Sequence, residues 1–123
     1  MKCESENLSL GPVVTPWFYE LLSAQTADGW FALTEELAEN LGKALKFLQS
    51  SASLIEGVSK QSTKEFILAT VLTVLILEIR APEHKDQWGM AVKKAKKVLD
   101  KQANNTTLDG KPVMVKVKEI FFP

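Results

Sequence analysis

Cysteine and histidine, two residue types that often serve as nucleophile and general base, each occur once in this chain and lie far apart in the sequence. Cys3 is the only cysteine and His84 the only histidine. A Cys–His pair can act as nucleophile and base, but no motif around either residue supports such a pair. His84 lies in the polar stretch 82–85 at an expected helix start, which is typical of a surface residue. A single cysteine allows no internal disulfide and favours a reducing compartment.

Three glutamates, Glu35, Glu36 and Glu39, lie close together on an expected helix and could suggest acid–base catalysis. That chemistry needs carboxyl groups whose pKa values are driven apart by burial. These glutamates alternate with apolar Leu37 and Ala38, so we expect them to face water. The chain has no paired histidines at helical spacing, no Cys-x-x-Cys and no glycine-rich phosphate loop. We therefore expect no catalytic residue, metal site, cofactor or small-molecule substrate, and hence no enzyme.

The lysines between Lys93 and Lys101 are the one candidate for binding phosphates. The alternative is a solvated helix face whose cations interact favourably with the C-terminal end of the helix dipole. Asp86, Asp100 and the balance of fifteen basic against fifteen acidic residues favour the alternative. We expect no binding to nucleic acid.

Length and composition, 123 residues with 46% hydrophobic and 24% charged, indicate one ordinary globular domain. Its strongest structural signal is the unbroken apolar run from Phe66 to Leu77. Such a run is shorter than the roughly 20 residues that a bilayer requires. Apolar on all sides, it predicts a central buried helix, capped at Ser62 with Glu65 reaching back, and stopped by Pro82. We expect no association with a membrane.

The remaining pattern predicts an all-α fold, a compact bundle of four to five helices around the central one. The last helix has the clearest buried stripe, Trp88, Val92, Ala95 and Leu99. The other expected helices run from Thr15-Pro16 to about Gln25, from Thr34 to Gly42, over a short stretch around Ala44, Leu45 and Leu48, and from Glu83 to Gln102, with a turn at Asp28-Gly29 and a loop over 50–60.

The end of the chain has a different pattern. Asp109-Gly110 is a hairpin-type turn, and Val113, Val115 and Val117 alternate with polar or flexible residues, which is strand periodicity. We therefore divide the chain into a flexible lead-in at 1–14, a helical interaction domain at 15–103 and an extended or hairpin tail at 104–123. A free strand edge can add to a partner's sheet, so the three valines are candidate contacts.

Aromatic residues supply the other candidate contacts, because they dominate the energetics of protein interfaces. Phe18 and Tyr19 are adjacent, and whichever faces outward is a candidate. Phe121 and Phe122 belong to an apolar chain end that so small a domain is not expected to cover fully. The three tryptophans, Trp17, Trp30 and Trp88, are expected to fill the core.

One family resemblance rests on specific motifs. The helix end and turn from Gln25 through Asp28-Gly29-Trp30, continued by Leu33-Thr34-Glu35-Glu36-Leu37, resemble the start of a known helical domain. That domain lies C-terminal to the inter-alpha-trypsin-like and von Willebrand factor A domains of large cytoplasmic proteins. Within the group, 66–75 and 87–95 are similar to two helices of the vault poly(ADP-ribose) polymerases. The likeness covers about Trp17 to Gln102, and the tail has no counterpart.

The resemblance implies a docking role without catalysis. In that family this region binds the major vault protein and brings the enzyme into the vault, a cytoplasmic ribonucleoprotein particle, while the transferase domain lies elsewhere. An alternative is a generic docking domain of a von Willebrand factor A domain-containing protein with an unknown partner. Another is a fragment of an α/α-toroid enzyme or thioester protein, where similar motifs serve packing. The resemblance also suggests that Gln25, Asp28 and Trp30 are structural.

Overall fold

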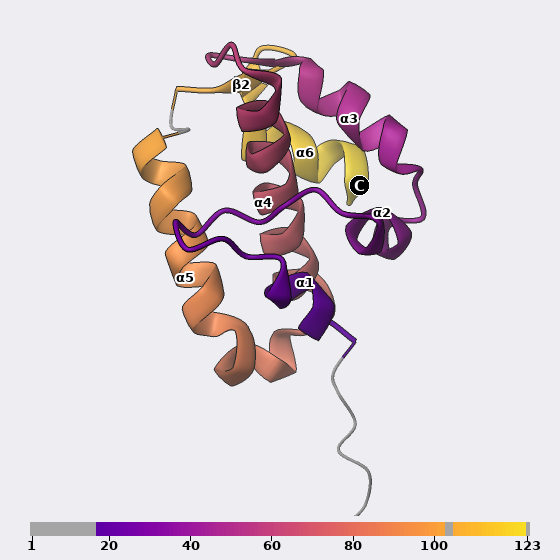
Figure 1. Ribbon diagram of the computed structural model, residues 1–123, viewed down its shortest axis with the longest axis vertical. Helices are drawn as coiled ribbons and strands as arrows, with labels where there is room; N and C mark the ends of the chain where they lie inside the picture. The colour runs from indigo at the N-terminus through magenta and orange to yellow at the C-terminus, as the bar shows by residue number, and fades with distance from the viewer. Residues whose placement is uncertain (1–16, 103–104, 123) are drawn as a thin grey trace, which may run out of the picture.

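The computed structural model describes residues 17–102 and 105–122. The predicted lead-in at 1–14 and the Thr15-Pro16 helix start lie outside these residues. The described chain is mostly helical, as predicted, with one small antiparallel sheet (Figure 1). Its helices are α1 (Tyr19–Ser23), α2 (Glu35–Leu41), α3 (Leu45–Ser53), α4 (Gln61–Arg80), the short 3-10 helix η1 (Pro82–His84), α5 (Lys85–Gln102) and α6 (Val113–Phe121), and its strands are β1 (Ile55–Glu56), β2 (Thr107–Leu108) and β3 (Lys111–Pro112).

Helix α4 is the centre of the fold, as the apolar run predicts. Every residue from Ile67 to Leu77 is buried, and α3, α5 and α6 all pack against this helix (Figure 1). A helix that is apolar on all sides has to be enclosed by other elements. The predicted cap at Ser62 is wrong, because α4 begins at Gln61 and Ser62 lies inside the helix. Gln61 Nε2 donates to Glu65 Oε2 at 3.1 Å instead.

The local signals around α2 are confirmed at both ends. Thr34 Oγ1 accepts a hydrogen bond from the Leu37 N–H at 3.2 Å, and Gly42 ends the helix with φ +67°. By contrast, α1 ends at Ser23, before the predicted Gln25. Helix α3 continues to Ser53, where a loop was predicted, and β1 follows almost at once.

The connection between α4 and α5 also follows the sequence. α4 ends at Arg80, and Ala81 separates it from Pro82, the first residue of η1. η1 leads into α5, whose predicted stripe of Trp88, Val92, Ala95 and Leu99 is buried throughout. The Trp88 Nε1–H donates to the Ala81 carbonyl at 2.7 Å, which fixes the indole beside the C-terminal end of α4.

The tail is partly what the sequence predicts. Asp109 and Gly110 adopt φ +55° and +78° and join β2 to β3, so the hairpin turn is confirmed. β2 also pairs antiparallel with β1, with Ile55 opposite Leu108, which places the sheet order at β1-β2-β3.

The valines that follow form a helix, so the strand predicted at Val113 to Val117 is wrong. Val113 and Val117 are buried against the core, whereas Val115 is 48% exposed. Residues two apart share a face in a strand, but residues four apart share one in a helix. α6 buries 113 and 117 and leaves 115 outside, so residues 113–117 offer no strand edge to which a partner's sheet could add.

We expect alanine substitutions at two of these valines to differ sharply in stability. Val117→Ala should lower the free energy of unfolding by about 2 kcal/mol, because it removes fully buried methyl groups. Val115→Ala should change it by no more than about 0.5 kcal/mol, because the side chain is exposed. Urea denaturation of both variants measures the difference. Equal losses at the two positions would show that the segment is a strand with all its valines on one face.

Candidate protein-interaction surface

The predicted aromatic contacts near the start of the described chain divide between core and surface. Phe18 is fully buried and Tyr19 is 57% exposed, so Tyr19 is the one available to a partner. Trp30 and Trp88 are buried as predicted, but Trp17 is 47% exposed and its assignment to the core is wrong. His84 is only partly exposed, because its ring lies 5.5 Å from that of Phe18.

The predicted contacts on the tail divide in the same way. Val113 and Val117 are buried in the core and are not available to a partner, whereas Val115 is exposed on the opposite side of α6. Phe121 and Phe122 are half-buried, packed against the core at one edge. The predicted site residues are therefore not gathered on one surface.

Phe121 instead meets an aromatic residue that is distant in the sequence. The rings of Phe47, on α3, and Phe121, on α6, have centroids 6.1 Å apart at 71°, an edge-to-face arrangement that aromatic pairs favour. Phe47 is 45% exposed, so the pair lies at the molecular surface. Ile120, the neighbour of Phe121, is exposed to a similar extent.

Two cations accompany these rings. Lys43 Nζ lies 5.4 Å from the ring centroid of Phe47, and Arg80 Cζ lies 5.7 Å from that of Phe122. Both distances are within the range of cation–π attraction. Arg80 also donates from Nη1 to the carbonyl of Asn40 at 2.5 Å, which ties the end of α4 to α2. We call this group, Lys43, Phe47, Arg80, Ile120, Phe121 and Phe122, the C-terminal aromatic surface.

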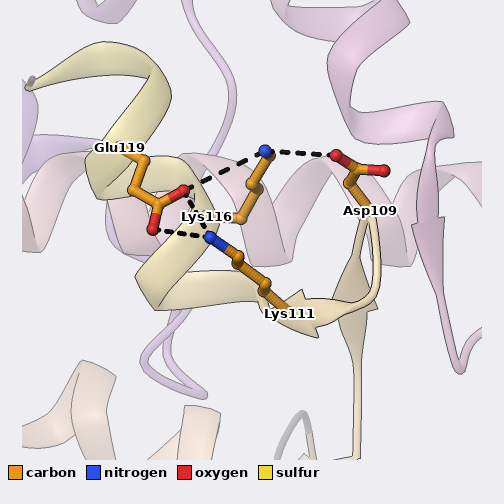
Figure 2. Close-up of polar contacts among 4 residues, drawn as sticks. All are labelled: Asp109, Lys111, Lys116 and Glu119. Carbon is orange, nitrogen blue, oxygen red and sulfur yellow. Dashed lines mark hydrogen bonds and ion pairs between the residues drawn. The ribbon is translucent and has the colours of Figure 1, made fainter.

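The position of α6 in this surface depends on packing more than on charge. Figure 2 shows the charged side chains that link the hairpin to α6. Lys111 Nζ bonds both carboxylate oxygens of Glu119 at 3.0 and 3.1 Å, and Lys116 Nζ lies 3.1 Å from Asp109 Oδ2 and 4.0 Å from Glu119 Oε1. Exposed ion pairs of this kind contribute about 0–1 kcal/mol each. Burial of Val113 and Val117 contributes more, about 1.5–3 kcal/mol per side chain, and so dominates the docking of α6.

Sequence reasoning missed Lys43, Phe47 and Arg80 as members of this surface. The available signal was Phe47, a large aromatic residue outside the stripe of Ala44, Leu45 and Leu48 predicted for its helix. Arg80 carried no such signal, because its contact with Phe122 joins segments that are more than forty residues apart.

The surface is suited to recognition, because aromatic and arginine side chains are the types enriched at interface hot spots.

Glu35, Glu36 and Glu39 are exposed to solvent, as predicted. Among residues 17–102 and 105–122, no cluster of three or more His, Cys, Asp or Glu side chains could hold a metal ion. No helix within the same described ranges has the length and apolar character to cross a membrane.

Comparison with known proteins identified no relative of this chain. No family model, curated protein or solved structure matches the chain.

Proposed function

We propose that this chain is a cytoplasmic, non-catalytic protein-interaction domain, a helical bundle around α4 whose C-terminal aromatic surface docks onto the major vault protein. The observation that carries the proposal is the gathering of Phe47, Phe121 and Phe122 at one exposed edge, flanked by Lys43 and Arg80. Aromatic side chains held in place by neighbouring rings and cations lose little entropy on binding.

The choice of partner comes from the resemblance to the vault poly(ADP-ribose) polymerases. The Gln25 to Trp30 and Leu33 to Leu37 motifs, with the apolar run inside α4, are the residues that support it. A docking domain of another von Willebrand factor A domain-containing protein would use the same surface with a different partner. The toroid-fragment alternative predicts a broad uncovered apolar face, and burial of Ile67 to Leu77 by the chain's own helices weighs against it.

Binding of the full 123-residue chain to purified major vault protein tests the proposal. The double variant Phe47→Ala/Phe122→Ala should weaken this complex at least about thirtyfold, since truncating a hot-spot residue costs about 2 kcal/mol or more. Tyr19→Ala is the matched control, because it removes an exposed aromatic ring on α1. Biolayer interferometry measures the affinities, and circular dichroism checks that each variant is folded.

Three results would contradict the proposal in different ways. If the unchanged chain does not bind the major vault protein, the assignment of the partner is wrong. If the double variant binds as tightly as the unchanged chain, the C-terminal aromatic surface is not the contact. If Tyr19→Ala alone weakens the complex, the partner contacts α1 instead.

A further inference from the structure

The outward face of α5 carries the most exposed large apolar side chain among the described residues. Met90 is 80% exposed, on the side of the helix opposite the buried stripe. Lys93, Lys94, Lys97 and Lys101 follow at three, four, seven and eleven positions, which places them beside Met90 and along the same side of the helix. We call these five residues the Met90–lysine face.

A hollow lies on each flank of this face, with volumes of about 680 and 610 Å³. Met90 and Lys93 line both of them. The first extends toward Glu78 of α4, and Gly89 is one of the residues that line it. A Cβ atom there would meet only Lys85 Cγ, at 3.8 Å. The second lies beside Ala91 and Gln25. Met90 is thus a flexible apolar ridge between two spaces that could hold aliphatic side chains of a ligand.

The charge around these hollows is mainly positive. Their lining includes five lysines and only two carboxylates, Glu78 and Asp86. Glu78 is already bonded to Lys96 at 2.6 Å. In the part of the chain that the structure describes, Lys93, Lys94 and Lys97 make no ion pair. The chain as a whole is neutral, so this positive charge belongs to the face and not to the protein in general.

We infer that the Met90–lysine face binds an acidic segment of a partner protein, whose apolar side chains lie on both sides of Met90. The unpaired lysines attract carboxylates, and the apolar atoms of Met90, Ala91 and Val92 contact the hydrophobic side chains between them. A nucleic acid fits less well, because an apolar ridge and Asp86 interrupt the cations that a phosphate backbone would follow.

This surface is separate from the C-terminal aromatic surface. Figure 1 shows α5 on one side of α4 and α3 on the other. The two surfaces can therefore be occupied at once, and the inference does not depend on the identity of the partner that binds α3 and α6. The domain would then link two proteins, or two segments of one protein, across α4.

Selection of short random peptides displayed on phage, with the full 123-residue chain as bait at low ionic strength, tests the inference. We expect the enriched peptides to be acidic and to carry at least two aliphatic or aromatic residues. Binding of a synthetic enriched peptide, measured by fluorescence anisotropy, should weaken at least about tenfold in Lys93→Glu/Lys97→Glu. Met90→Gln, which keeps the length and helix propensity of the side chain, should weaken it about fivefold.

The matched control is Lys46→Glu/Lys118→Glu, which makes the same change in net charge on α3 and α6. It should bind the peptide within about twofold of the unchanged chain, and a peptide with lysines in place of its acidic residues should prefer Lys93→Glu/Lys97→Glu. The inference would be overturned if the enriched peptides lacked acidic residues, or if peptide binding weakened equally in Lys46→Glu/Lys118→Glu and in Lys93→Glu/Lys97→Glu. The inference would also be overturned if a short single-stranded RNA bound the chain more tightly than the peptide and bound the Lys93→Glu/Lys97→Glu variant more weakly than the unchanged chain.

Discussion

Replacing Trp88 with alanine should lower the free energy of unfolding by about 3–5 kcal/mol, the usual cost of truncating a large buried aromatic residue. The indole is the largest side chain of the stripe that packs α5 onto α4, and it is almost fully buried. The variant also loses the hydrogen bond from Nε1–H to the Ala81 carbonyl. The buried Ala81 carbonyl would keep its other hydrogen bond, from the His84 N–H at 3.0 Å, so the variant loses one of this acceptor's two partners.

A second substitution separates packing from hydrogen bonding. Trp88→Phe keeps most of the apolar contact but removes the donor, so it should cost about 1–3 kcal/mol. Met90→Ala, two residues away on the exposed side, should stay within about 0.5 kcal/mol of the unchanged chain. Guanidinium denaturation followed by circular dichroism measures all three. An unchanged midpoint for Trp88→Ala would mean that the indole is exposed in solution and available to a partner.

Gly29→Val should cost about 3 kcal/mol or more, for two separate reasons. Gly29 has φ +109°, which a β-branched residue adopts only with strain of about 1–3 kcal/mol. A Cβ atom at this position would also lie 2.8 Å from Val98 Cγ2 and 3.0 Å from the carbonyl oxygen of Lys94. The latter is backbone of α5, so the turn has to move away from the helix, and overpacking of this kind costs about 1–3 kcal/mol more.

Gly110→Val is the matched control for this prediction. Gly110 also has positive φ, +78°, but nothing lies within 4 Å of a Cβ atom placed there. It should therefore show only the conformational strain, about 1–2 kcal/mol. Thermal unfolding of both variants measures the difference due to contact with α5. If Gly29→Val kept its melting temperature while losing partner binding, the turn would be a contact site and its structural interpretation would be wrong.

The turn also explains most of the motif that carries the family resemblance. Gln25 Nε2 donates to the carbonyls of Gly29, at 3.2 Å, and Ala91, at 2.9 Å, so this side chain closes the turn and joins it to α5. Trp30 is buried after the turn, and the Phe31 N–H donates to Thr70 Oγ1 of α4 at 2.9 Å. Gln25, Gly29 and Trp30 are thus structural. Asp28, which was expected to share that role, is exposed.

Elements whose signals are local in the chain could be predicted from the sequence. The apolar run of α4, the stripe of α5, the Thr34 cap, the Gly42 stop and the Asp109-Gly110 turn all follow from residues within a few positions of each other. Hydrophobic periodicity and backbone preferences act over that range, so the local sequence pattern is enough to predict these elements. The buried Trp88 was predictable for the same reason, because three further apolar residues share its side of the helix.

The form of the tail and the composition of the C-terminal aromatic surface depend on contacts between segments that are distant in the sequence. The spacing of Val113 and Val117 fits both a strand, with a period of two, and a helix, in which residues four apart share a face. The helix is favoured because it packs both valines against the apolar surface of α4. Phe18 and Tyr19 are adjacent aromatic residues, and the sequence does not show which of them faces outward. The position of α1 against the core buries Phe18 and exposes Tyr19. The C-terminal aromatic surface joins α3, α4 and α6 through contacts between distant segments, which no local pattern encodes because side chains meet there only after the chain has folded.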